Sequence, residues 1–125
     1  MEVERMKWIT RDIVRANPDK AFLFGDNSER RGFGGQAKEM RGEPNAFGIV
    51  TKVWPSSEDA AYMCDSQYEM NRDQIDEDIQ KVLDSGHQTV VIPSDGLGTG
   101  LAQLDKRAPK TFAYLQQRLA ELETL

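Results

Sequence analysis

The sequence contains few of the residues that hold a small fold together through a covalent bond or a metal ion. Its 125 residues include one cysteine, Cys64, and one histidine, His87. A single cysteine cannot form an intramolecular disulfide, and this pair supplies too few ligands for a structural zinc site. The same scarcity disfavours Cys–His and Ser–His–Asp nucleophilic catalysis. We therefore expect a fold that requires no disulfide, metal or cofactor.

The sequence also lacks an excess of basic residues and any long apolar run. Its 16 lysines and arginines are outnumbered by 21 acidic residues, which gives a net charge of −5. This balance argues against a general nucleic-acid binder, whose affinity depends on neutralising phosphates. No apolar run approaches the length of a signal-peptide core or a membrane span. We expect one compact cytoplasmic domain over residues 1–125, with neither nucleic acid nor a membrane as its partner.

What the sequence does contain is two glycine-rich loops, each preceded by a short apolar run. The first glycine loop, Gly25–Gln36, follows Ala21–Phe24, and the second glycine loop, Pro93–Gly100, follows Thr89–Ile92. Short apolar runs bounded by turn residues are typical of strands buried on both faces of a parallel sheet. Ligands of such sheets bind beyond the carboxyl ends of the strands. We therefore expect the two loops to face one cleft.

The glycines of both loops favour an anionic ligand. Glycine adopts positive φ without strain, and its missing Cβ lets backbone N–H groups approach a phosphate closely. The first glycine loop also runs into Gln36–Arg41, a stretch of good helix formers that ends at Gly42, and the N-terminus of a helix attracts anions. Taken singly, either loop is explained equally well as a plain turn.

The rest of the pattern predicts alternating strands and helices. Asn71 and Gln74 resemble a capping box at the start of the clearest helix. Residues 53–67 have no clear hydrophobic period, and this segment could cover the cleft as a lid. In chain order we expect an edge strand within Met1–Ile9, a helix over Arg11–Ala16, strands over Ala21–Phe24 and Phe47–Thr51, a helix over Asn71–Ser85, a strand over Thr89–Ile92 and a helix beginning at Pro109. This order predicts an α/β fold.

Three segments of the chain resemble the macrodomain superfamily. Phe24–Asn27 with Gly32–Ala37 look like its first loop, in which a polar strand end is followed by a glycine loop that opens a helix. Ile92–Leu101 is similar to the phosphate loop of the branch that includes the terminal ADP-ribose protein glycohydrolase, and Ile49–Lys52 stands in for the Ile-Thr-Lys strand of that branch. The resemblance implies a three-layer α/β/α fold, with a mainly parallel mixed sheet flanked by helices, that binds ADP-ribose or a related nucleotide.

The segments 32–52 and 95–104 look closer still to a compact macro-like family of phage and bacterial proteins. One departure concerns catalysis. The glycohydrolases carry an aspartate directly after the Gly-Leu of the second loop, where this chain has Ala102, with Asp105 three residues later. The lysine with which those glycohydrolases form a covalent intermediate has no clear counterpart in this chain. Lys52 corresponds to the strand-end lysine of the Ile-Thr-Lys element, which is a different position, and Lys38 is a candidate for the catalytic lysine only by its place between loop and helix. The resemblance therefore implies nucleotide binding more directly than it implies hydrolysis.

The leading interpretation is a binding site for a pyrophosphate-containing nucleotide, such as ADP-ribose or an NAD-derived signal. The backbone N–H groups of Gly34–Gln36 would hold one phosphate and those of Gly98–Gly100 the other. Asp26 and Asn27 would orient ribose hydroxyls or a base amine. Phe33 or Trp54 would stack on the base or on the terminal ribose. The predicted ligand-binding residues are Asp26, Asn27, Phe33, Gly34, Gly35, Gln36, Lys52, Asp95, Gly96, Gly98, Thr99 and Gly100.

Two other functions stay open at this point. One is hydrolysis of an ADP-ribosyl or phosphate ester bond, with Asp95 as the acid or base and Asp26 as the next candidate. Asp95 lies between an apolar strand and a glycine loop, where we expect a buried carboxylate with N–H donors around it. The other is an interaction protein that has a macro-like fold and binds no small ligand. Because neither aspartate has an obvious partner base in the sequence, we rank binding first.

Overall fold

The computed structural model describes residues 1–125 and is built on a four-stranded sheet with strand order β1-β4-β2-β3. Every neighbouring pair of strands runs parallel. The only antiparallel pairing is an isolated bridge between Lys52 and Tyr62. The strands are β1 (Glu2–Met6), β2 (Lys20–Asn27), β3 (Ala46–Lys52) and β4 (Thr89–Pro93). The predicted α/β fold is therefore confirmed, with the N-terminal strand at an edge.

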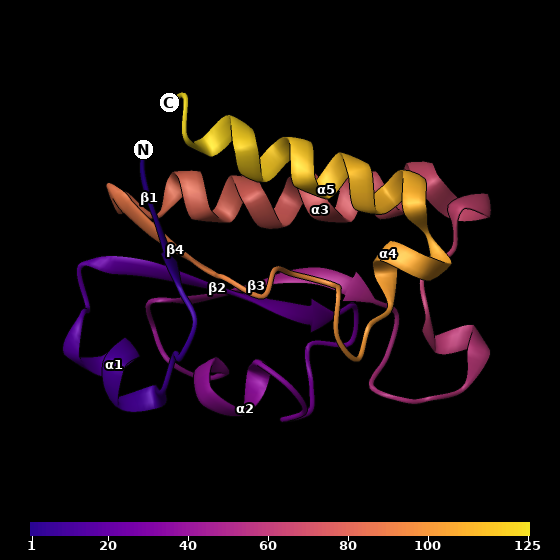
Figure 1. The fold of residues 1–125 in the computed structure, drawn as a ribbon, viewed down its shortest axis with the longest axis horizontal. Coiled ribbons are helices and arrows are strands. Elements are labelled where there is room, and N and C mark those ends of the chain that lie inside the picture. Colours follow the sequence, from indigo (N-terminus) through magenta and orange to yellow (C-terminus); the bar gives the residue numbers. More distant parts are fainter.

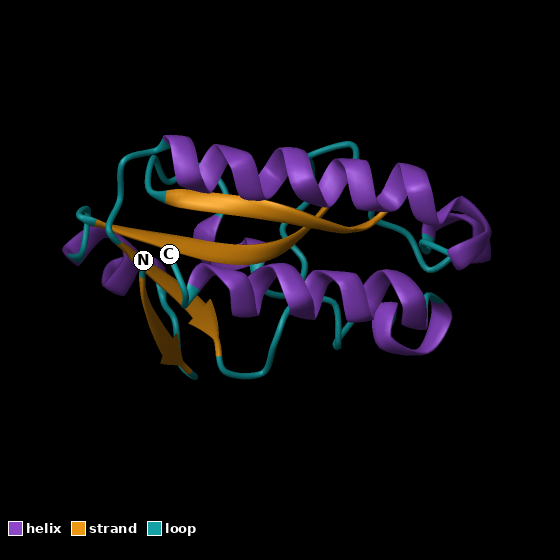
Figure 2. Ribbon diagram, turned by 90° about the horizontal axis from the view of Figure 1, so that it is seen from above, coloured by secondary structure: helices purple, strands orange, loops and turns teal.

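Helices cover both faces of the sheet (Figure 1). The long helices α3 (Tyr68–Asp84) and α5 (Pro109–Leu122) lie side by side on one face (Figure 2). The short helices α1 (Arg11–Ala16) and α2 (Ala37–Met40) lie on the other face. This arrangement is the expected three-layer α/β/α fold. None of the helices combines the length and the apolar character needed to cross a membrane.

The apolar run of β2 supplies both layers of the core. Ala21 and Leu23 belong to the cluster under α3 and α5, whereas Phe22 and Phe24 belong to the cluster that includes Val14 and Met40 of α1 and α2. Successive side chains of a strand point to opposite faces, so a strand covered on both faces is apolar at every position. All four of these β2 residues are buried. This double burial explains the continuous apolar run in the sequence.

The structure corrects the predicted start of α3. The helix begins at Tyr68, three residues before Asn71, and its N-cap residue Gln67 makes no side-chain capping bond. Asn71 is buried inside the helix, where its amide donates to the carbonyl of Cys64 at 3.0 Å and to Thr111 Oγ1 at 3.2 Å. The capping-box prediction was therefore wrong, because Asn71 makes tertiary contacts in place of a local cap.

Three further segments differ from the sequence-based expectation. Gly25–Asn27 continue β2, so the strand is longer than predicted. Residues 53–67 form two short 3-10 turns, η1 (Asp59–Ala61) and η2 (Asp65–Gln67), and the sequence did not predict helix α4 (Leu104–Arg107). Helix α4 follows Gln103, whose φ of 49° is left-handed, a conformation that an ordinary side chain seldom adopts and that sequence patterns do not reveal.

Candidate functional site

The two glycine loops line one pocket of about 520 Å³ at the carboxyl ends of β2, β3 and β4. Strand β2 pairs in parallel with both β3 and β4, so the loops that follow β2 and β4 emerge at the same edge of the sheet. All of the predicted ligand-binding residues line this pocket except Phe33, which is exposed. The expectation that the two loops share a cleft is confirmed.

Unpaired backbone N–H groups are present on both walls of the cleft. Those of Gly34, Gly35 and Gln36 on one side, and of Gly98, Thr99 and Gly100 on the other, donate no hydrogen bond within the protein. The first wall is not the N-terminus of a long helix, because α2 spans only Ala37–Met40. The anion-binding potential of this wall therefore comes from its free N–H groups and not from a helix dipole.

The side chain of Gln36 joins the two walls at the floor of the cleft. Its Oε1 accepts a hydrogen bond from the N–H of Gly25 at 2.8 Å, and its Nε2 donates to the carbonyl of Gly96 at 2.9 Å. One side chain thus connects the end of β2 to the second glycine loop. Sequence reasoning assigned only the backbone of Gln36 to the site.

Asp26 is buried in a network of ion pairs with Arg30 and Arg41. Its carboxylate pairs with Arg41 through both oxygens and with Arg30 through Oδ2, the latter at 3.3 Å. Oδ1 also accepts the N–H of Asn27 at 2.8 Å. Because both oxygens are already bonded, the structure offers no support for the predicted catalytic role of Asp26. Its carboxylate instead holds Arg41 at the cleft and Arg30 beside the edge of β3.

Asn27 uses its side chain to shape the first glycine loop. Its amide nitrogen donates to the carbonyl of Arg31 at 2.7 Å, and its amide oxygen accepts the N–H of Glu29 at 3.1 Å. The second bond is that of an Asx-turn, which folds the chain back after the strand. Both polar atoms of the side chain therefore support the loop itself.

Arg30 and Asp78 cover the open edge of β3. Arg30 donates to the carbonyl of Gly48 at 3.4 Å and to Asp78 at 2.5 Å, while Asp78 accepts the N–H of Val50 at 2.8 Å. These two backbone groups point away from the sheet and would otherwise invite another strand. Burial alone would lower the pKa of Arg30, but its bonds to Asp78 and Asp26 outweigh burial and raise the pKa.

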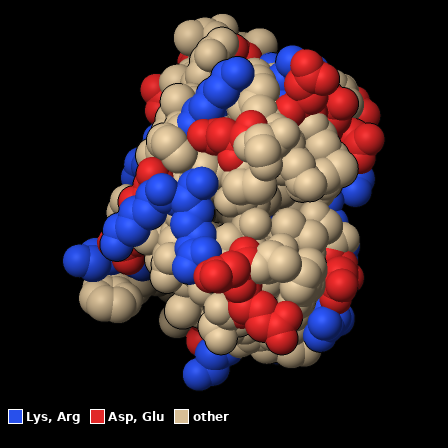
Figure 3. Space-filling model, turned by 90° about the vertical axis from the view of Figure 1, so that its right-hand side faces the viewer, with Lys and Arg blue, Asp and Glu red and all other residues tan.

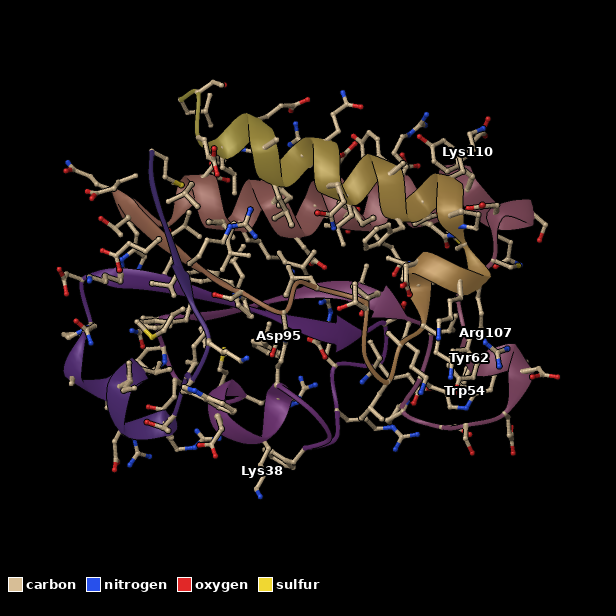
Figure 4. All side chains as sticks on the ribbon, in the orientation of Figure 1. Lys38, Trp54, Tyr62, Asp95, Arg107 and Lys110 are labelled. Carbon is tan, nitrogen blue, oxygen red and sulfur yellow. The ribbon has the colours of Figure 1, made fainter.

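Asp95 lies at the cleft but is exposed, contrary to the buried carboxylate expected there. Figure 4 draws it between α2 and the β4 end of the sheet. Its carboxylate bonds to no other side chain, whereas its backbone carbonyl accepts the hydroxyl of Thr99 at 2.7 Å. The hydroxyl of Thr99 is thus used inside the loop, and the Asp95 carboxylate has no partner base.

Lys52 lies at the carboxyl end of β3, as predicted, and pairs in register with Asn27. Its ammonium group is 4.5 Å from the centre of the Tyr62 ring, and the guanidinium carbon of Arg107 is 3.7 Å from the same centre. Burial first, and then the positive charge of Arg107, lower the pKa of Lys52 below its usual value. Lys52 is a half-buried cation at the cleft.

Sequence reasoning missed several residues that line the cleft. Arg31, Arg41 and Leu101 contribute to its walls, whereas Trp54, proposed as a stacking residue, does not line it. Figure 4 draws Trp54 at the end of the molecule where Tyr62 and Arg107 meet. Figure 3 looks onto this end, and basic side chains gather along one side of the view. Arg41 was read only as a helix former, because its partner Asp26 is far away in the sequence.

The fold and the cleft together define a class: an α/β/α protein with a polar, anion-compatible cleft beyond the carboxyl ends of its parallel strands. The chain belongs to the family of unknown function DUF7831, whose model matches residues 4–118. No curated protein and no solved structure gave a match.

Proposed function

We propose that the protein binds ADP-ribose or a related pyrophosphate-containing nucleotide in the cleft between its two glycine loops. The observation that carries the proposal is the set of six unpaired backbone N–H groups, three on each wall. Glycine-rich loops bind phosphate oxygens through such groups. Two sets on opposite walls suit the two linked phosphates of a pyrophosphate, one for each wall.

The size and charge of the cleft support the same ligand class. Its volume of about 520 Å³ lies within the range of small-molecule sites, roughly 300–1,000 Å³. Arg31, Arg41 and Lys52 line it, against the acidic side chains of Asp26 and Asp95. The local excess of positive charge contrasts with the net charge of −5 of the whole chain. The proposal accordingly places the protein in the cytoplasm, with a small nucleotide as its ligand and neither nucleic acid nor a membrane as its partner.

Binding without hydrolysis fits the residues of the cleft better than catalysis does. Ala102 lines the cleft at the position where the glycohydrolases that the sequence resembles carry an aspartate. Asp26 is bonded to two arginines, and Asp95 has no second group to act as its partner. General acid–base catalysis requires a group free to exchange a proton within reach of the substrate. We therefore propose a binding protein.

The test is calorimetric titration of the protein with ADP-ribose, ADP and adenosine. We expect ADP-ribose and ADP to bind and adenosine to bind much more weakly, because it lacks the pyrophosphate. In a thermal melt, ligand at about 100 times its Kd should add about 2.7 kcal/mol to the free energy of unfolding. Absence of any binding at millimolar ADP-ribose would contradict the proposal.

The matched variant is Gly34→Val, with Lys38→Met as its control. A Cβ at Gly34 would meet only the flexible tip of Leu101, at 3.7 Å, and φ there is not left-handed, so the fold should survive. The valine should nevertheless block the cleft wall and abolish binding. Lys38 is exposed and lies outside the cleft, so its variant should bind as the wild type does. Equal affinity of both variants would show that the first glycine loop is not the binding wall.

A further inference from the structure

A cluster of two cations around one tyrosine lies at the β3 end of the cleft. Lys52 comes from the end of β3, Tyr62 from the segment between η1 and η2, and Arg107 from the end of α4. Lys52 and Arg107 both pack on the Tyr62 ring, at 4.5 and 3.7 Å from its centre. Figure 4 shows Tyr62 and Arg107 together at this end of the molecule.

Arg107 is bonded to two neighbouring side chains, whereas Lys52 has no acidic partner. The Arg107 guanidinium donates to Gln103 Oε1 at 2.9 Å and to Asp59 Oδ1 at 3.2 Å. Lys52 forms no ion pair, and the charged group that shares its aromatic ring, Arg107, is another cation. The other basic residues that line the cleft differ, because Arg41 pairs with Asp26 and Arg31 pairs with Glu29. Lys52 is therefore the one uncompensated cation of the cleft.

A comparable cluster elsewhere in the molecule is compensated. Lys110 lies 4.2 Å from the centre of the Tyr68 ring, with Arg72 at 5.9 Å from the same centre. Here Asp65 accepts the backbone N–H of Lys110 at 2.8 Å, which brings an acidic group next to the lysine. The Tyr68 cluster is outside the cleft. Stacked cations thus occur in both places, but only the Tyr62 cluster contributes a cation to the lining of the cleft, and that cation, Lys52, has no acidic partner.

The position of Lys52 separates it from the glycine walls. In the strand order β4-β2-β3, the second glycine loop follows β4, whereas Lys52 ends β3 on the other side of β2. A pyrophosphate held between the loops would lie over the end of β2, so Lys52 would meet a different part of the ligand. An ammonium group taken out of water without a partner is unfavourable, and a bound anion relieves that cost.

We propose that Lys52, held in place by Tyr62 and Arg107, forms a separate phosphate subsite, so that the natural ligand carries a third phosphate group in addition to its pyrophosphate. This inference rests on the proposed nucleotide-binding function and specifies its ligand. A phosphate monoester carries close to two negative charges at neutral pH, which suits a site with two adjacent cations. Lys52 contacts the phosphate, and Arg107 acts as a positioning residue through the Tyr62 ring.

The test compares three ligands by calorimetry: ADP-ribose, and ADP-ribose with a monophosphate on either the adenosine ribose or the terminal ribose. The wild-type protein should bind one phosphorylated form about tenfold or more tightly than ADP-ribose, as expected for a charged hydrogen bond. The form preferred identifies the end of the ligand that reaches Lys52. Equal binding of all three compounds would overturn the inference.

Variants assign the preference to the cluster. The measured quantity is the dissociation constant of ADP-ribose divided by that of the preferred phosphorylated form. In Lys52→Met this ratio should fall to about one, and in Arg107→Gln it should fall part of the way. Lys110→Met, which removes the lysine of the matched Tyr68 cluster, should leave the ratio at its wild-type value. A preference that survives Lys52→Met would show that the third phosphate binds elsewhere and would overturn the assignment.

A second measurement separates this inference from the proposed function. Inorganic phosphate is titrated into the free protein while the NMR signals of Lys52 and Tyr62 are followed. Saturable shifts that vanish in Lys52→Met would support the subsite even if none of the three nucleotides bound, in which case only the nucleotide proposal would fail. Absence of saturable shifts, together with equal binding of the three nucleotides, would leave no phosphate subsite at Lys52.

Discussion

The two glycine loops form opposite walls of one cleft, but different interactions hold them in place. The first is held by charged side chains: Arg41 donates to the carbonyl of Gly32 at 2.7 Å and pairs with Asp26, and Arg30 reaches Asp78 at 2.5 Å. Several of these groups are buried or nearly so. Loss of one partner from a buried ion pair is strongly destabilising, because the other charge is left without compensation.

The second glycine loop has no ion pair and depends on backbone geometry and packing. The N–H of Gly96 donates to the carbonyl of Pro93 at 2.9 Å, and the N–H of Leu104 donates to the carbonyl of Gly98 at 2.7 Å. The side chain of Leu97 is completely buried beneath the loop. We infer that the first wall is sensitive to changes of charge and the second to added atoms, and the variants below test this difference.

The largest loss of stability is expected at Gly48 of β3, which lies against Asp26, the carboxylate that holds the first wall. A Cβ at this position would lie 2.3 Å from Asp26 Oδ2 and 2.8 Å from Asp26 Cβ. Gly48→Ala must therefore displace the carboxylate that holds Arg41 and Arg30. We expect a loss of about 3 kcal/mol or more in the free energy of unfolding, measured by urea denaturation, because crowding and a broken buried ion pair act together.

Gly100→Ala is the matched control on the other wall. A Cβ there would meet nothing within 4 Å, and φ at Gly100 is not left-handed. The substitution should change the free energy of unfolding by no more than about 0.5 kcal/mol. If the two variants proved equally stable, Asp26 would not hold the first wall in the way that its contacts indicate.

A smaller loss is expected for Gly98→Ala in the second glycine loop. Gly98 has a φ of +83°, and a Cβ there would lie 3.0 Å from Leu104 Cβ and 3.3 Å from Thr51 Cγ2. Backbone strain and crowding should together destabilise the protein by about 2 kcal/mol in urea denaturation. The loss should not change with salt concentration, because no charge is involved.

Gly86→Ala separates strain from crowding. Gly86, after α3, has a nearly identical φ of +82°, but a Cβ there would meet nothing within 4 Å. Its cost should be that of strain alone, about 1 kcal/mol. Should Gly98→Ala cost no more than Gly86→Ala, close packing against Leu104 would not contribute to holding the second wall.

The sequence was sufficient to predict the parts of the fold that depend on local patterns. The apolar runs at Ala21–Phe24 and Thr89–Ile92 lie in strands, and the glycines after them line one cleft, because parallel strands with buried faces leave their carboxyl ends at a common edge. Pro109 begins α5 as expected. These features follow from residues that are close together in the chain.

The contacts that shape the cleft join residues that are far apart in the chain and have no local signature. Asp26 pairs with Arg41, and Arg30 with Asp78, across 15 and 48 positions. Asn71 was assigned to a helix cap because its contact with Thr111 could not be inferred from spacing. One signal was available: a glycine inside a strand, such as Gly48, often marks a close approach by another group, which here is Asp26.

Apart from the controls Gly100→Ala and Gly86→Ala, the smallest loss of stability is expected at Gln36, the side chain that connects the two walls. Gln36→Glu keeps the volume and the acceptor for the N–H of Gly25, but an ionised carboxylate cannot donate to the carbonyl of Gly96. We expect a loss of about 1–2 kcal/mol at pH 7, measured by urea denaturation, and weaker binding of ADP-ribose.

The pH dependence of Gln36→Glu identifies the lost bond. When the glutamate becomes protonated, near its ordinary pKa of about 4.3, it can again donate to the carbonyl of Gly96. The stability difference from wild type should therefore shrink as the pH falls towards 4. Gln36→Ala removes both bonds at every pH, so its difference should stay constant. If the stability loss of Gln36→Glu did not vary with pH, the bond from Gln36 to Gly96 would not be what connects the first wall to the second.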